Sequence, residues 1–168
     1  MLLGLKRKES NVMMSRGAIL PKLESKPIAH VLVRMIVGCV FLSEGIQKFL
    51  FSDSLGVGRF IKIGIPAPEV MAPFVGVVEI ACGLLVLVGL FTRLAAVPLI
   101  IDMLVAISTT KIPILMEKGF WAMAHEARTD WSMLLGSLFL LVVGAGRWSM
   151  DYLFAQRSAE AKQQQDQS

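Results

Sequence analysis

Five charged residues lie inside segments that are otherwise apolar enough to cross a membrane. They are spread over three apolar runs: Arg34, Glu44 and Lys48 in 28–51, Glu79 in 70–91, and Asp102 in 94–110. A charge at the centre of a bilayer costs at least about 2.5–3.5 kcal/mol. We therefore expect these side chains to pair with one another, to take part in chemistry, or to do both.

Helical periodicity and depth suggest the partners. At about 100° per residue, Arg34, Glu79 and Asp102 each share a helix face with small residues, which mark helix contacts in lipid. Counting about 1.5 Å per residue, these three lie about 9, 16 and 12 Å from the inner end of their segments. The pattern predicts a buried polar network of Arg34, Glu79 and Asp102, and a local i, i+4 ion pair of Glu44 with Lys48.

Two interpretations of such a network stay open. It can be a structural tie that fixes the register of three helices, because its charges are nearly balanced. It can also be a site for a proton, a quinone head group or a polar substrate, because carboxylates inside a membrane often serve proton transfer.

The elements that position these charges follow from composition. The chain has 168 residues, of which 55% are hydrophobic, and its mean hydropathy is +0.65. About 20 apolar residues span a bilayer, and lipid-exposed backbone must form helices or closed barrels. We predict an all-α, four-helix transmembrane bundle, with helices at about 28–51, 70–91, 94–115 and 129–148, within a membrane domain of residues 27–154. A soluble protein with buried helices is the alternative.

The termini are polar and unevenly charged. Residues 1–26 are basic and residues 155–168 are rich in Gln, so both are predicted to be disordered. The net charge is +4, and the excess of Lys and Arg near the two ends predicts that both termini are cytoplasmic. The basic N-terminal segment has no interleaved aromatic residues, so its expected partner is the lipid bilayer and not nucleic acid.

Other chemistry has little support. The histidines, His30 and His125, lie at opposite ends of the predicted bundle and cannot share one haem iron. Cys39 and Cys82 do not have metal-ligand spacing, and two buried small residues are favoured over a redox pair. No metal site is predicted. In the insert 111–129, Trp121 and His125 are candidates for an outer pocket, and a solvated loop histidine is the alternative.

An ordered set of motifs resembles the DoxX family of small integral membrane proteins. The residues that carry the resemblance are Arg34 followed by GCVFLSEGIQKF at 38–49, GIPAPE at 64–69, GVVEIACGLLVLVGLFTRLAA at 76–96 and GAGRWSMD at 144–151. The similarity covers about 29–154. The motif positions that carry over are Arg34, Glu44, Lys48, Glu79, Arg93, Arg147 and Asp151, and the family attaches no agreed catalytic role to them.

The resemblance implies a multi-pass protein of the bacterial inner membrane. Some similar proteins are linked to a quinol oxidase that uses thiosulfate, or to redox-stress complexes. The function expected is therefore an accessory component of a quinone- or sulfur-linked redox system, with redox-complex subunits as partners and no independent catalytic activity. A non-catalytic assembly or scaffold factor, and a small transporter or channel acting as a homo-oligomer, are the alternatives. No cofactor is evident, and quinone is the candidate ligand.

Overall fold

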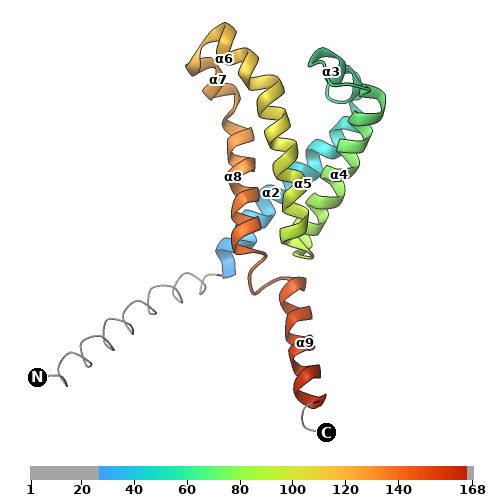
Figure 1. Ribbon diagram of the computed structural model, residues 1–168, viewed down its shortest axis with the longest axis vertical. Coiled ribbons are helices and arrows are strands. Elements are labelled where there is room, and N and C mark those ends of the chain that lie inside the picture. The colour runs from blue at the N-terminus through green and yellow to red at the C-terminus, as the bar shows by residue number, and fades with distance from the viewer. Residues whose placement is uncertain (1–26, 166–168) are drawn as a thin grey trace, which may run out of the picture.

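The computed structural model describes residues 27–165, and all of its regular elements in this range are helices. With the labels of Figure 1, they are α2 (Pro27–Leu50), α3 (Val57–Lys62), α4 (Pro68–Val88), α5 (Thr92–Ala106), the π-helix η1 (Ile107–Lys111), α6 (Ile112–Lys118), α7 (Phe120–Glu126), α8 (Arg128–Val143) and α9 (Met150–Gln165). The disorder predicted for residues 1–26 lies outside the described residues.

Three helical stretches are long and apolar enough to cross a membrane. They cover Ile28–Leu50, Pro68–Val88 and Thr92–Lys118, the last being α5, η1 and α6 in continuous succession. The predicted fourth span corresponds to α8, which has 16 residues and is about 24 Å long. This is shorter than the roughly 30 Å hydrocarbon core. The all-helical membrane architecture is confirmed, and the fourth crossing stays a prediction.

The helices form two antiparallel pairs. α2 packs against α4 and α5 packs against α8, and the pairs join through contacts of α4 with α5 and of α2 with α8. The two pairs diverge toward the end that carries α3, α6 and α7 (Figure 1). The core where they meet is apolar and includes Val37, Phe41, Val86, Leu99 and Leu140.

Glycines bring α2 and α4 into close contact. A Cβ atom at Gly45 would lie 2.7 Å from the carbonyl oxygen of Gly76, and one at Gly83 would lie 3.0 Å from that of Gly38. Small residues permit such backbone approach between helices in lipid. The contacts fix the antiparallel register, because Gly38 faces Gly83 while Gly45 faces Gly76.

The outer surface of the helices is largely apolar. Side chains such as Leu32, Ile36, Val77 and Leu104 are exposed, as expected for groups that face lipid tails rather than water.

The C-terminal segment differs from its prediction. Residues 155–168 were predicted to be disordered, but α9 is helical to Gln165. Its second half is rich in Ala and Gln, which have high helix propensity, and this explains a helix without a buried apolar face. Residues 166–168 lie outside the described range.

Candidate functional site

The first charged contact of the site joins α2 to α4. The ammonium Nζ of Lys48 donates a hydrogen bond of 2.6 Å to Oε2 of Glu79. The two side chains are only 12% and 2% exposed, respectively. Because a buried carboxylate without a partner is costly, Lys48 is the cation that makes Glu79 tolerable inside the bundle.

The register of the helices explains this pair. Glycine contacts place Lys48 about six residues, or about 9 Å, from the level of Glu79. Side chains on a helix lean toward its N-terminus. Because α2 and α4 are antiparallel, Lys48 and Glu79 lean toward each other, and the long lysine chain covers the remaining gap.

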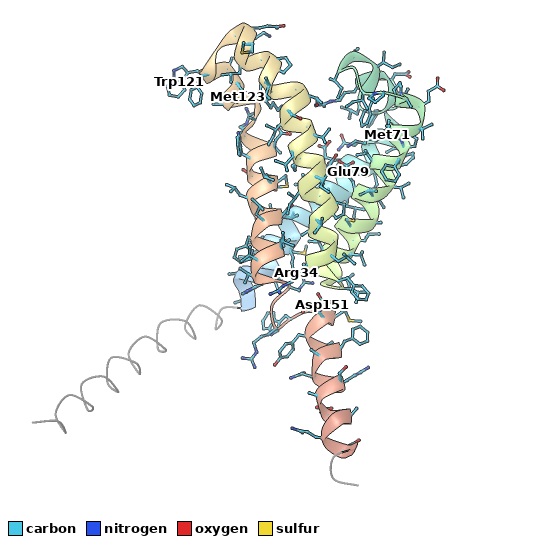
Figure 2. All side chains as sticks on the ribbon, viewed as in Figure 1. Arg34, Met71, Glu79, Trp121, Met123 and Asp151 are labelled. Atoms are coloured by element: carbon cyan, nitrogen blue, oxygen red, sulfur yellow. The ribbon has the colours of Figure 1, made fainter. Side chains whose placement is uncertain are left out.

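Asp102 of α5 is the third member of the site. Its carboxyl group lies close to that of Glu79, and both carboxyl groups lie within electrostatic range of Lys48. Figure 2 shows Glu79 directed into the region between the two helix pairs. Two carboxyl groups and one lysine, from three helices, therefore meet inside the bundle.

A second ion pair, between a buried lysine and a partly exposed aspartate, extends the site to α8. Nζ of Lys111 lies 3.1 Å from Oδ2 of Asp130, and Lys111 is buried. Asp130 in turn acts electrostatically on Asp102. We refer to the five residues together as the charged cluster: Lys48, Glu79, Asp102, Lys111 and Asp130.

The π-helix η1 accounts for the position of Lys111. Pro113 cannot donate a backbone hydrogen bond, and its ring disfavours a regular α-helical turn before it. The hydroxyls of Ser108 and Thr109 donate to the carbonyl of Val105, and that of Thr110 donates to Ala106. A π turn contains an additional residue, so it changes the face on which later side chains lie.

The charged cluster has an unbalanced set of groups. With all five side chains ionised, three carboxylates face two ammonium groups, and one negative charge is left over. One bound proton removes this excess, and a shared carboxyl pair is a chemically suitable place for it. The cluster can therefore hold a proton, and its lysines can donate hydrogen bonds to a carbonyl or another oxygen acceptor.

Arg34 does not contact the carboxylates. The predicted Arg34–Glu79–Asp102 network is therefore wrong in its cation, because Lys48 takes the place predicted for Arg34. Nε and Nη2 of Arg34 donate to the carbonyls of Val86 and Leu87 at 2.9 and 2.6 Å, and Nη1 donates to that of Trp148 at 2.6 Å. The register explains this, because Arg34 lies opposite Leu87, near the end of α4, where the last carbonyls lack the usual i+4 N–H partner.

Asp151 completes the junction at that end. Its carboxylate accepts hydrogen bonds from the backbone N–H groups of Phe91 and Thr92, at 2.7 and 3.1 Å, and so caps the start of α5. Its own N–H donates to the carbonyl of Gly89. Figure 2 shows Arg34 and Asp151 together near the start of α9, well away from Glu79.

The remaining predicted site residues are not brought together. Lys48 bonds to Glu79 and not to Glu44, which is exposed, so the predicted Glu44–Lys48 pair is also corrected. Trp121 is 83% exposed on α7, and His125 is exposed as well. Cys39 is exposed on the surface of α2 and is not buried as predicted, while Cys82 is half-buried. Among residues 27–165, no group of three His, Cys, Asp or Glu side chains is arranged to hold a metal ion.

Comparison with known proteins agrees with this architecture. The family model described as DoxX matches residues 29–112, which is half of the chain. The protein belongs to the DoxX family. The DoxX match contains four members of the charged cluster and ends before Asp130.

Two relatives match a longer part of the chain than the family model does. "Uncharacterized membrane protein Rv3486" of Mycobacterium tuberculosis is 56% identical over 138 residues, covering 79% of this chain and 85% of the relative. "Putative oxidoreductase CatD" of Bacillus subtilis is 30% identical over 128 residues, covering 76% and 88%. No solved structure matches the chain.

Lys111 and Asp130 were missed by the sequence interpretation. In a regular helix, nine residues place Lys111 about 180° from Asp102, on the opposite face. The succession of Ser108, Thr109 and Thr110 before Pro113 was the available signal, because hydroxyl side chains and a proline commonly accompany irregular helical turns.

Proposed function

We propose that this DoxX protein is an accessory component of a quinone- or sulfur-linked redox system of the bacterial inner membrane. The observation that carries the proposal is the charged cluster, which is largely shielded between helices and lacks one positive charge for balance. Intramembrane ionisable groups commonly mark proton relays or substrate paths. The relative named "Putative oxidoreductase CatD" supports a redox setting.

The proposed chemistry divides between this chain and a partner. Reduction of a quinone to a quinol consumes two electrons and two protons. A lysine of the cluster would donate a hydrogen bond to a quinone carbonyl. The Glu79–Asp102 pair would deliver the two protons one at a time, taking up a new proton from the aqueous phase after each transfer. The electrons would come from a redox subunit bound to this protein, which by itself would have no independent catalytic activity.

The proposed topology places both termini in the cytoplasm. It is supported by Arg93, Arg147 and Arg157 at the end that carries α9, and by six Lys and Arg residues that precede Pro27 in the sequence. A reporter fused after Ser168 should give a cytoplasmic signal, and a periplasmic signal would overturn this orientation.

A non-catalytic assembly factor is the second candidate. It is favoured by the mutual pairing of the lysines, since Lys48 bonds to Glu79 and Lys111 bonds to Asp130. Such pairs can serve only to fix helix register. This candidate predicts that variants of the cluster lose a bound partner protein rather than a reaction.

Quinone binding distinguishes the two candidates. The protein would be placed in lipid nanodiscs with a short-chain ubiquinone or menaquinone analogue, and the retained quinone would be extracted and quantified. We expect stoichiometric retention by the native protein and by Glu44→Gln, which removes an exposed carboxylate of the same helix as Lys48. Glu79→Gln should lose retention. Equal retention by folded Glu79→Gln, or no retention by the native protein, would contradict a quinone site at the cluster.

A further inference from the structure

A pocket of about 840 Å³ lies at the end of the bundle opposite α3, α6 and α7. It is formed where the start of α2, the first residues of α5, the end of α8 and the start of α9 meet. The charged cluster does not line it. The pocket is therefore a feature separate from the site described above.

The walls of the pocket are of two kinds. Phe91, Leu94 and Val143 contribute apolar side chains that are also exposed on the outer surface of the helices. Arg93 and Arg147 contribute two guanidinium groups. Arg93 is the second residue of α5 and Arg147 lies four residues after the end of α8, so the basic wall lies at the level where hydrocarbon gives way to head groups. Trp148, exposed beside it, is typical of that level.

The arginines keep donors available for a ligand. Nη2 of Arg93 donates to the carbonyls of Val142 and Val143, at 3.2 and 3.5 Å, which holds the side chain over the end of α8. Nε and Nη1 of Arg93 make no hydrogen bond to the residues that the structure describes. The Arg147 guanidinium lies 5.8 Å from the centre of the Tyr152 ring, which orients it without using its donors.

One carboxylate, that of Asp151, also lines the pocket, and other groups engage it. Asp151 already accepts the backbone hydrogen bonds of Phe91 and Thr92, and it attracts the nearby Arg34. Two arginines consequently remain without a carboxylate partner among the pocket residues, next to an apolar wall that continues along α5 and α8.

We propose that this pocket binds an anionic phospholipid, with the phosphate held by Arg93 and Arg147 and an acyl chain along Leu94 and Val143. Basic pockets between helices on the cytoplasmic side commonly bind the head groups of anionic lipids. Arginine forms bidentate hydrogen bonds with phosphate oxygens, which a neutral polar side chain cannot replace. A free phosphate ion shares the head-group chemistry but leaves the apolar wall unused.

Native mass spectrometry of the full-length protein in detergent tests the proposal. Phosphatidylglycerol and phosphatidylcholine with the same acyl chains would be added in competition, and the lipid bound to the protein would be counted. The native protein should retain phosphatidylglycerol preferentially. Each arginine near an anionic head group is worth about a fivefold change in affinity, so Arg93→Gln with Arg147→Gln should reduce the preference about thirtyfold.

Matched control variants distinguish lipid binding in this pocket from a general effect of the protein's positive charge. Arg59→Gln with Arg157→Gln removes the same charge outside the pocket and should keep the native preference. Arg147→Gln alone leaves every backbone hydrogen bond of the junction intact and should still reduce the preference about fivefold. Equal retention of the two lipids by the native protein, or an equal loss in the control, would overturn the proposal. Displacement of the lipid by millimolar inorganic phosphate would do so as well, because it would identify a free-anion site.

Discussion

The ammonium of Lys48 and the carboxylate of Glu79 are 2.6 Å apart, although the residues lie 31 positions apart on two different helices. Each charge makes the other tolerable at membrane depth. Together they also join α2 to α4 at the level where Asp102 of α5 approaches Glu79. The pair is therefore the element through which three helices share one buried charged cluster.

Replacing the cation of this pair should destabilise the protein. Lys48→Met leaves Glu79 buried without its partner, which costs about 3–5 kcal/mol. Thermal unfolding in detergent should therefore show a clearly lowered transition. Adding Glu79→Gln should recover part of the loss, while Glu44→Gln alone should have little effect. A Lys48→Met protein as stable as the native one would contradict the pair.

Arg34 should matter for a different reason. Arg34→Leu removes hydrogen bonds to Val86, Leu87 and Trp148, and hydrogen bonds to a charged group are worth about 1.5–3 kcal/mol each. The free energy of unfolding should fall by at least about 3 kcal/mol. Arg34→Lys should remain destabilised, because one ammonium cannot reach both α4 and the segment before α9. Rescue of Arg34→Leu by Glu79→Gln would show that the carboxylate, and not the helix end, is the true partner.

The glycine contact between α2 and α4 should also be sensitive. Gly45→Ala places a Cβ 2.7 Å from the carbonyl oxygen of Gly76, and such overpacking typically costs about 1–3 kcal/mol. Ala81→Val on the exposed face of α4 adds larger bulk toward lipid and should be nearly neutral. Urea-induced unfolding of the two variants compares them directly. An equal effect of both would argue against close helix packing at Gly45.

The Lys111–Asp130 pair should show energetic coupling. A double-mutant cycle with Lys111→Met and Asp130→Asn should give an interaction energy of about 1–2 kcal/mol, because the side chains are in direct contact. A cycle of Lys111→Met with Glu44→Gln serves as the unpaired control and should be additive. Additivity in both cycles would mean that η1 does not direct Lys111 to α8.

Much of the architecture could be predicted from the sequence. Apolar run length located the spanning helices, and small residues beside Glu79 and Asp102 correctly indicated that these carboxylates face other helices. Arg34 was wrongly predicted as the cation of the network, because the depth of each residue was counted from the ends of its own helix. The glycine pairs Gly38/Gly45 and Gly76/Gly83 have the same spacing, and this spacing already indicated the register of the two helices. When the two pairs are aligned antiparallel, Arg34 lies beside Leu87.

Other features depend on irregular geometry that periodicity does not represent. Lys111 reaches Asp130 only because η1 departs from 100° per residue. The cap that Asp151 provides to α5 joins residues 60 positions apart through a turn, and no local pattern specifies such a contact.

Redox activity in native membranes tests the central claim, that the charged cluster serves a quinone- or sulfur-linked reaction. Membrane vesicles from a strain that lacks the gene would be complemented with the native protein, Asp102→Asn or Glu44→Gln at equal abundance. The rate of quinone-pool reduction by thiosulfate or a thiol would then be measured. The native protein and Glu44→Gln should restore the rate, and Asp102→Asn should lower it at least about tenfold, since it removes a proton-transferring group. A native rate with Asp102→Asn, or a rate independent of the gene, would contradict the account.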